Sequence, residues 1–370
     1  MGSGLVTLFL SGDVMLGRGV DQILPHPGDP ALSEPYVRDA RAYVEMAEAV
    51  NGTVPRPVPF SWPWGDALPV LADSGPDVRV VNLETSVTRS DDAAAGKEVL
   101  YRMNPANLPC LTAARPDVCV LANNHVLDYG RRGLEETLAV LADARLRTAG
   151  AGRDLAAARR CVSLPLPEGR RVLVVSLGME SSGVPPQWAA TARRSGVHFA
   201  ADPSPAVAAE VTARLREVRR PGDVTVVSVH MGSNWGYQVP RSQVHFAHAL
   251  IDGGADIVHG HSSHHPRPVE VYRGRLVLYG CGDLINDYEG IGGYERYRDD
   301  LRLLHLASVD PATGALHEVR IVPLQARRLR LTHASASDCR VVSDLLDRIS
   351  HGLGVRMQAE RDGSVTARPS

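Results

Sequence analysis

Short apolar runs rich in β-branched residues alternate along the chain with stretches whose apolar residues recur at helical spacing. This alternation predicts an α/β protein in which buried strands are connected by amphipathic helices. The spacing between the strands leaves room for the crossover helices that parallel or mixed sheets require. We expect strands at residues 6–10, 78–83, 118–122, 172–177, 224–229, 256–259 and 276–280, and helices at residues 37–50, 106–114, 134–144, 205–218 and 243–251.

Polar residues follow six of these seven strands directly. In chain order the clusters are SGD, NLET, NNH, HMGSN, HGHSSHH and CGD. Asp, Asn and Ser often only cap the next helix, but capping does not explain six clusters in succession. Ligands of α/β folds bind outside the carboxyl ends of the strands, so we predict that these clusters form one site.

Two segments are expected to be loops that could contact a ligand. Residues 55–64 (PRPVPFSWPW) contain four prolines, which excludes a regular helix and favours a rigid, partly apolar flap. Residues 287–300 contain three glycines and three tyrosines, a composition that suits a mobile lid. A solvated surface loop is the alternative for each segment.

The composition excludes several classes of protein. Of the 370 residues, 44% are hydrophobic and 22% are charged, and the formal net charge is -2. These values are not those of a fibrous, disordered or membrane-spanning protein, and they lack the basic excess that nucleic-acid binding usually needs. No apolar run approaches the roughly 18 residues that would span a bilayer. We therefore expect a cytoplasmic protein with no membrane anchor and no nucleic-acid partner.

Two residue types need a separate explanation. The five cysteines are scattered and show no metal-type spacing, so reduced thiols are expected. Lys97 is the only lysine among the 40 basic residues, and we attribute this to a GC-rich coding sequence.

Histidine is clustered, with seven of the 14 histidines inside 36 residues. Together with the carboxylate and amide side chains at the strand ends, they form a mixed oxygen and nitrogen ligand set that suits Mn, Mg, Ca, Fe or Zn. His245 and His248 lie three residues apart on a helical stretch, where surface or core-edge positions are the more common outcome. For His259 and His265, bracing a loop explains the sequence equally well.

The segments GDVMLGR, VNLETSVT, LANNHVLDYG, VVSVHMGSNW and IVHGHSSHHPRPVEVYRGRLVLYGCGDLINDY occur in this order within residues 5–324. With these motifs the chain resembles CapA-type proteins, the poly-γ-glutamate capsule biosynthesis branch of the calcineurin-like metallophosphoesterases. The resemblance implies a four-layer αββα sandwich with a metal centre at the loop-bearing edge of its two sheets. The catalytic domain would span residues 1–326, and residues 327–370, with a helix at 338–349, would form an appendage packed on it.

The resemblance also assigns roles to individual residues. His125 matches a histidine that either supports the metal ligands or acts as an acid or base, and His264 matches the second histidine of the last motif. A catalytic imidazole needs a partner that fixes its tautomer, so we expect Asp128 or Asp283 to orient one of these histidines. For Asp128, a helix cap or a turn is the alternative. The residues matched to metal ligands are Asp13, Glu84, Asn124, His230 and His261.

Three departures from the superfamily pattern favour a single metal ion. Met15 stands where the first motif carries a histidine, and Glu84 stands where the second motif usually has Gly-Asp. Ser262 and Ser263 separate the two histidines of the last motif, where one residue is usual. We therefore expect one divalent ion, with Ca, Mn or Mg favoured over Zn, and no organic cofactor.

Soluble members of the same branch include peptide epimerases of lasso-peptide biosynthesis. Epimerisation needs a base, an acid and stabilisation of an enolate-like intermediate, and the surplus of imidazoles could supply the first two. The main prediction is therefore a metal-dependent epimerase that inverts the Cα of a C-terminal residue of a ribosomal peptide. The side chains expected to hold the peptide are Trp62, Trp64, Tyr288, Tyr294 and Tyr297.

Two enzymatic or biosynthetic alternatives remain open. One is a metallophosphoesterase with His125 as general acid, and the other is a CapA-like protein of poly-γ-glutamate biosynthesis. A binding protein without catalytic activity is a third class. The sequence leaves the oligomeric state open.

Overall fold

The computed structural model describes residues 4–370 and contains two large β-sheets. The strands of the first sheet are β1 (Val6–Val14), β2 (Val78–Leu83), β5 (Val118–Val120), β6 (Arg147–Ala149), β16 (Asp283–Ile285), β17 (Leu301–Val309), β18 (Leu316–Ala326), β19 (Leu331–His333), β20 (Val355–Ala359) and β21 (Val365–Pro369). Their order is β20-β21-β18-β17-β1-β2-β5-β6, with β16 beside β1 and β19 beside β18.

The second sheet has seven strands in the order β11-β9-β12-β13-β15-β14, with β8 beside β9. These strands are β8 (Val162–Pro165), β9 (Arg171–Met179), β11 (Phe199–Ala200), β12 (Val224–His230), β13 (Ile257–His261), β14 (Val269–Tyr272) and β15 (Arg275–Leu278). Two small two-stranded sheets are formed by β3 (Ser86–Val87) with β4 (Arg102–Met103) and by β7 (Ala151–Gly152) with β10 (Gly196–Val197).

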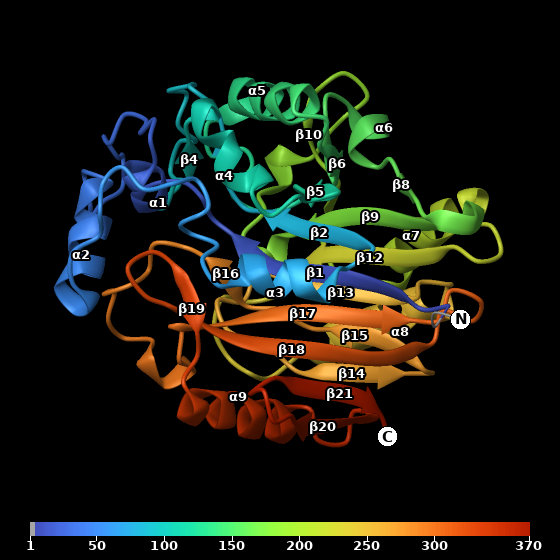
Figure 1. Cartoon of the computed structure of the whole chain (residues 1–370). Coiled ribbons are helices and arrows are strands. Elements are labelled where there is room, and N and C mark those ends of the chain that lie inside the picture. The colour runs from blue at the N-terminus through green and yellow to red at the C-terminus, as the bar shows by residue number, and fades with distance from the viewer. Residues whose placement is uncertain (1–3) are drawn as a thin grey trace.

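Most helices cover the outer faces of the two sheets, and the last helix contributes to the core between them (Figure 1). The helices are α1 (Gly19–Ile23), α2 (Arg41–Asn51), α3 (Ala67–Ser74), α4 (Leu108–Thr112), α5 (Gly130–Asp143), α6 (Leu155–Ala158), α7 (Pro205–Val218), α8 (Arg241–Asp252) and α9 (Ala336–Ile349). Helix α7 begins where the sequence predicts it, because the Ser204 side chain accepts a hydrogen bond from the Val207 N–H and Pro205 occupies the first turn.

The apolar side chains form three layers of core. One layer lies between the sheets and joins β1 and β2 to β9 and β12. A second packs the outer face of the first sheet against α1 to α5, and a third packs the outer face of the second sheet against α7 and α8. The predicted four-layer αββα sandwich is therefore confirmed.

Each of the seven predicted strands is present, but the sequence reading missed the hairpin of β17 and β18 and the short strand β16. Arg302 and His305 lie on β17 and are each only 2% exposed. Because β17 is buried on both faces, its polar residues interrupt the apolar pattern without any exposed face to explain them. The predicted helix at 106–114 is a 3₁₀ turn followed by the short helix α4.

Residues 55–64 form turns that lead into α3, and they pack against the core. Trp64 is fully buried and its Nε1 donates a hydrogen bond to the Cys110 carbonyl at 2.8 Å. Trp62 packs against the same core and donates to the Arg328 carbonyl at 3.0 Å. The Trp64 ring is thus occupied by core packing and is not available to a substrate, whereas Trp62 is only partly buried and its substrate-binding role stays a prediction.

Residues 327–370 add strands to the first sheet. Strand β21 pairs with β18 in antiparallel register, and β20 pairs with β21. Val342 and Leu346 of α9 are buried in the core between the sheets. The division of the chain at residue 326 stays a prediction.

The strand directions bring one edge of each sheet to a common place. Strands β1, β2, β5 and β16 are parallel to one another, as are β9, β12, β13 and β15. The carboxyl ends of these strands therefore meet, as the sequence analysis assumed. None of the helices formed by residues 4–370 has the length and hydropathy of a membrane span.

Candidate metal centre

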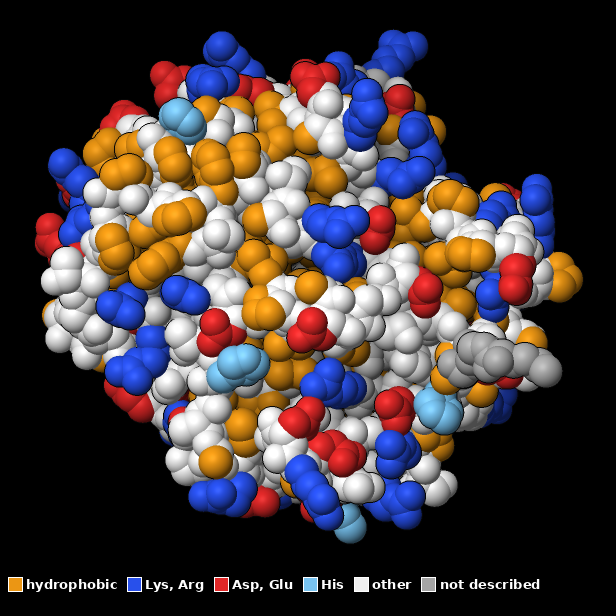
Figure 2. Space-filling model, in the orientation of Figure 1, with side chains coloured by type: hydrophobic (Ala, Val, Ile, Leu, Met, Phe, Trp, Pro, Cys, Tyr) orange, Lys and Arg blue, Asp and Glu red, His pale blue; other side chains and the backbone are white. Residues whose placement is uncertain are grey.

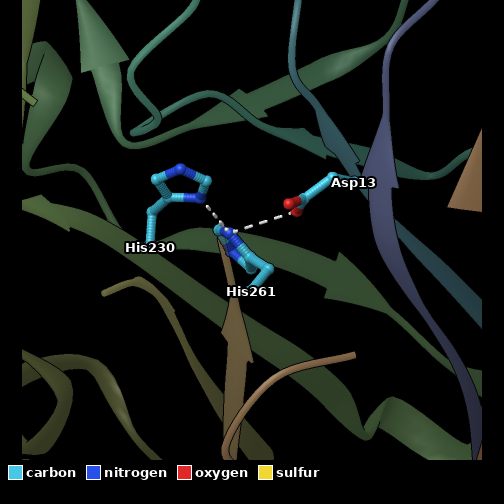
Figure 3. Close-up of side chains that lie close together, drawn as sticks. All are labelled: Asp13, His230 and His261. Atoms are coloured by element: carbon cyan, nitrogen blue, oxygen red, sulfur yellow. Dashed lines mark hydrogen bonds and ion pairs between the residues drawn. The ribbon is translucent and has the colours of Figure 1, made fainter. Parts of the chain in front are cut away.

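Three side chains from three strands converge at the carboxyl edge of the sheets (Figure 3). Asp13 lies near the end of β1, His230 ends β12 and His261 ends β13. One ligand atom from each lies within 4.8 Å of the other two, and all three side chains are buried. One carboxylate and two imidazoles are a common set of protein ligands for a divalent cation.

A chain of hydrogen bonds fixes the tautomer of His261. His259 Nε2 lies 2.7 Å from the Ser11 carbonyl oxygen, which only accepts, so Nε2 carries the proton. Burial lowers the pKa of His259 to about 4, so its Nδ1 is unprotonated and accepts from Ser228 Oγ at 3.1 Å. Ser228 Oγ in turn accepts from His261 Nε2 at 2.8 Å. The Nδ1 of His261 therefore keeps a free lone pair.

His230 presents a second lone pair to the same point. Its Nε2 donates to Asn124 Oδ1 at 2.9 Å, which leaves Nδ1 unprotonated. The Nδ1 atoms of His230 and His261 lie 2.7 Å apart. Burial holds the pKa of both imidazoles well below the ordinary value, so no added proton separates them at neutral pH. Two lone pairs that face each other need a shared cation, and a metal ion fits this arrangement.

Two buried carboxylates share one amide donor at this centre. Asn82 Nδ2 donates to Asp13 Oδ1 at 2.7 Å and to Glu84 Oε2 at 3.1 Å. Burial raises the pKa of Asp13 to about 7, and the Asp283 carboxylate adds to the rise. Burial and the charge of Asp13 also raise the pKa of Glu84 well above its ordinary value. The excess of buried negative charge is the second reason why a cation fits here.

A close approach of two chain segments places Asp283 beside Asp13. The Asp13 N–H donates to the Gly282 carbonyl at 3.0 Å, and the two aspartates occupy paired positions on β1 and β16. A Cβ on Gly12 would lie 1.7 Å from the Gly282 oxygen. Position 12 therefore accepts only glycine while β1 and β16 remain this close.

Glu84 and Asn124 lie on the other side of His230. Glu84 Oε1 is 3.6 Å from His230 Nε2 and 3.9 Å from His125 Nε2. Both side chains are near enough to interact with the centre, and their roles as ligands stay predictions.

His125 forms a carboxylate–histidine pair with Asp128. Its Nδ1 lies 2.7 Å from Asp128 Oδ2 and 2.9 Å from Lys97 Nζ, while Nε2 faces Glu84. Lys97 Nζ also donates hydrogen bonds to the Asp128 carboxylate and to the Asn124 carbonyl oxygen. Burial lowers the pKa of His125 to about 4, although Asp128 acts in the opposite direction. His125 is thus a neutral imidazole near pH 7.

His264 forms the matching pair with Asp283. Its Nδ1 lies 3.0 Å from Asp283 Oδ1, and Asn286 donates to Asp283 Oδ2 at 2.6 Å. Burial alone would lower the pKa of His264, but the charge of Asp283 outweighs it and raises this pKa. The two histidine pairs therefore favour opposite protonation states, which is the usual arrangement of a base and an acid.

An aromatic cluster lies against His264 and His265. Tyr294 stacks on Trp235 at a centroid distance of 4.0 Å, and Trp235 lies 5.2 Å from His264. Tyr297 stacks on His265 at 4.6 Å. Tyr288 meets His264 edge-on at 5.1 Å. Residues 287–300 therefore lie next to the centre, and a substrate-binding role for Tyr288, Tyr294 and Tyr297 stays a prediction.

Three residues of this site were not predicted from the sequence. Lys97 follows no predicted strand, and its being the only lysine of the chain was the one signal available. Trp235 directly follows the HMGSN cluster but was not singled out. Ser228 points from the middle of a strand, and only the three-dimensional structure shows that it bridges His259 and His261.

Comparison with known proteins places the sequence in a family. The sequence matches the family described as "Bacterial capsule synthesis protein PGA_cap" over residues 7–288. The chain belongs to this family. The matched range includes each of the metal-centre residues named above, from Asp13 to Asp283. The resemblance to CapA-type proteins is thereby confirmed.

Relatives of this PGA_cap-family chain cover most of its length. A probable polyglutamine synthesis accessory protein of Mycobacterium tuberculosis (strain H37Rv) is 52% identical over 367 residues, which are 99% of this chain and 97% of that protein. The PGA biosynthesis protein CapA of Bacillus subtilis (strain 168) is 29% identical over 290 residues, 78% of this chain and 64% of that protein. A solved structure from Thermus thermophilus covers 69% of this chain and 93% of its own at 13% identity and a TM-score of 0.34, too low to carry an argument.

Proposed function

We propose that the chain is a metal-dependent hydrolase that assists the synthesis of a glutamate or glutamine polymer. The convergence of Asp13, His230 and His261 carries the proposal, because it provides a cation site between two histidine–carboxylate pairs. The kind of polymer is inferred from the names of the relatives. These names favour polymer synthesis over the epimerisation of a ribosomal peptide, so the alternative of the sequence analysis becomes the main proposal.

The chain itself supplies the acid and the base. His125 is neutral near pH 7, and its Nε2 faces the centre and can accept a proton from water. His264 carries a raised pKa, and its protonated ring can donate to the leaving group. A divalent ion bound by Asp13, His230 and His261 would polarise the scissile group.

The mixture of ligands favours manganese. A carboxylate and nearby amide oxygens suit Mg, Ca and Mn, whereas imidazole suits Mn and the later transition metals better than Ca or Mg. We propose one Mn²⁺ ion per chain.

Metal binding is the first test. Isothermal titration of metal-free protein with Mn²⁺ should give one site, and Asp13→Asn and His261→Ala should each weaken binding by at least tenfold. His245→Ala is the matched control, because His245 is exposed on α8 and lies outside the centre. Equal Mn²⁺ affinity in wild type and His261→Ala would overturn the assignment of the site.

Hydrolysis is the second test. Mn²⁺-loaded protein is incubated with a γ-linked glutamyl oligomer or with p-nitrophenyl phosphate, and the products are identified by mass spectrometry. Metal-dependent cleavage of the oligomer that is lost in His125→Ala supports the proposal. Cleavage of the phosphate ester alone would indicate the phosphoesterase alternative, and no cleavage by protein with bound Mn²⁺ would refute the hydrolase.

One observation favours epimerisation as a second candidate. His125 and His264 flank the centre with opposite preferred charges, as inversion of a carbon between a base and an acid requires. The same oligomer incubated in D₂O distinguishes the two reactions. Deuterium at Cα without cleavage indicates an epimerase, and cleavage without Cα deuterium indicates a hydrolase.

A further inference from the structure

A cavity of about 620 Å³ lies beside the metal centre. It is bounded by the end of α2, by residues 288–300 and by β17 and β18. Its volume falls within the range of roughly 300–1,000 Å³ that is typical of small-molecule sites. Tyr288 lines the cavity and also contacts His264. Arg302 lines it too, with Nη1 3.8 Å from Asp283 Oδ2. The cavity and the His264–Asp283 pair therefore share a wall.

Arg302 is a buried cation with unused donors. The residue is 2% exposed, and its Nη2 donates to Asn286 Oδ1 at 2.7 Å. Within residues 4–370, its Nε and Nη1 have no hydrogen-bond partner. Leaving buried donors of a charged group unpaired is unfavourable, and a carboxylate is the acceptor that matches a guanidinium best. The wall of the cavity thus offers a position for an anionic group.

Most acidic groups of the lining are already engaged. Glu289 accepts from the Asn51 side chain and from the N–H groups of Arg328 and Leu329. Asp300 pairs with Arg298 and accepts from Gln325. These two carboxylates therefore connect the segments that line the cavity and are not free to bind a ligand.

Asp299 differs from those carboxylates. It lines the cavity and is half-buried, and among the described residues it forms no ion pair within 4.0 Å, not even with Arg302. Asp299 and Arg302 line the same cavity three residues apart in the chain. Burial raises the pKa of Asp299, while the charge of Arg302 acts in the opposite direction. The cavity therefore contains a cation and an anion that are close but separated. A ligand with both charges fits such a pair.

We propose that this cavity binds an α-amino-acid zwitterion, with its carboxylate at Arg302 and its ammonium group at Asp299. The inference rests on the proposed function for the source of the ligand. The first residue of a γ-linked glutamyl chain keeps its α-ammonium and α-carboxylate groups, so the cavity would hold the amino end of the polymer. Free glutamate has the same pair of groups.

Titration calorimetry of metal-free protein tests the proposal with L-glutamate, γ-glutamylglutamate, N-acetylglutamate and glutarate. We expect the first two to bind and the last two, which lack an ammonium group, to bind at least tenfold more weakly. Tighter binding of the dipeptide identifies a chain end, and tighter binding of glutamate identifies the free amino acid. Equal affinity for all four probes, or no binding up to 10 mM, overturns the proposal.

Variants assign the two charges. Arg302→Gln and Asp299→Asn should each weaken glutamate binding at least tenfold. Glu295→Gln, a change of an exposed lining residue that accepts from the Gly293 N–H, should leave it unchanged. Asp299 is half-buried, so Asp299→Asn remains informative if Arg302→Gln fails to fold. Unchanged binding in Asp299→Asn would overturn the proposal. Mn²⁺ titration of Asp299→Asn separates the two sites, since normal metal affinity with lost glutamate affinity shows that only the cavity has changed.

Discussion

Asp13 is a buried carboxyl group in conflict with its surroundings, which disfavour its negative charge. Its carboxylate has lost its water and lies near Asp283 and Glu84, so near neutral pH it holds a proton that a metal ion would have to displace. The consequences of this conflict can be measured both in metal affinity and in stability.

Metal affinity should rise with pH across neutrality. With the pKa of Asp13 at about 7, the carboxylate is about one-tenth ionised at pH 6 and about nine-tenths ionised at pH 8. We expect Mn²⁺ to bind about tenfold more tightly at pH 8 than at pH 6 in calorimetry. In Asp13→Asn the remaining affinity should change much less between these values. A pH-independent wild type would show that Asp13 is not a ligand.

The stability of the metal-free protein should change in the opposite direction. A carboxyl group whose folded pKa is raised from 3.8 to about 7 contributes stability that is present below the lower value and is lost as the pH rises through the higher one. The melting temperature of metal-free protein should therefore fall between pH 5 and pH 8. The fall should be smaller in Asp13→Asn, and an equal fall in both proteins would contradict the assignment.

Residue types at strand ends could be predicted, but their partners could not. Asp13, His230 and His261 follow from the rule that ligands gather at the carboxyl ends of parallel strands. Lys97 lies in a loop between β3 and β4 and reaches His125 only through the tertiary fold. From the composition alone, the scarcity of lysine was attributed to a GC-rich coding sequence. Only the structure shows which groups Lys97 contacts.

Among the elements, the long buried strands at the site and the amphipathic helices were the easiest to predict, and the short or late strands were missed. Strand β2 and helix α7 have the bounds that the pattern gives, because their apolar positions and their caps are local features. Strand β17 was missed because Arg302 and His305 are buried inside it, a result that depends on Asp283, Asn286 and the cavity. Polar residues at functional positions thus break the local pattern.

The segment 55–64 gives a prediction about packing. Trp64→Ala should lower the free energy of unfolding by about 3–5 kcal/mol, because it empties a fully buried site in the core. Mn²⁺ affinity of the folded fraction should remain unchanged. Trp62→Ala is the control, with a smaller loss because its ring is only partly buried. A loss of metal or peptide binding in Trp64→Ala without a loss of stability would instead support the interpretation of residues 55–64 as a substrate-contacting flap.

At the scale of the whole molecule, residues 327–370 complete the first sheet. Without them β18 would become an edge strand, and the core would lose Val342, Leu346, Val365 and Ala367. A chain ending at Ala326 should aggregate or melt at a markedly lower temperature in size-exclusion and thermal-unfolding measurements. Val341→Ser is the control, because this α9 side chain is 41% exposed. A stable, monomeric truncated chain would support the predicted division at residue 326.

The visible surface is mixed in character (Figure 2). Acidic and basic side chains alternate over much of this face, and hydrophobic side chains gather at its upper left. This mixture agrees with the net charge of -2, and the face shows no broad patch of a single charge.

The position of Lys97 has a consequence for spectroscopy. Because this residue is the only lysine, reductive methylation with ¹³C-formaldehyde labels a single side chain in addition to the α-amino group. The labelled nitrogen, Lys97 Nζ, lies 2.9 Å from His125 Nδ1, inside a chain of 39.8 kDa. Metal and substrate binding could then be followed by the Lys97 methyl signal, once it has been distinguished from that of the α-amino group.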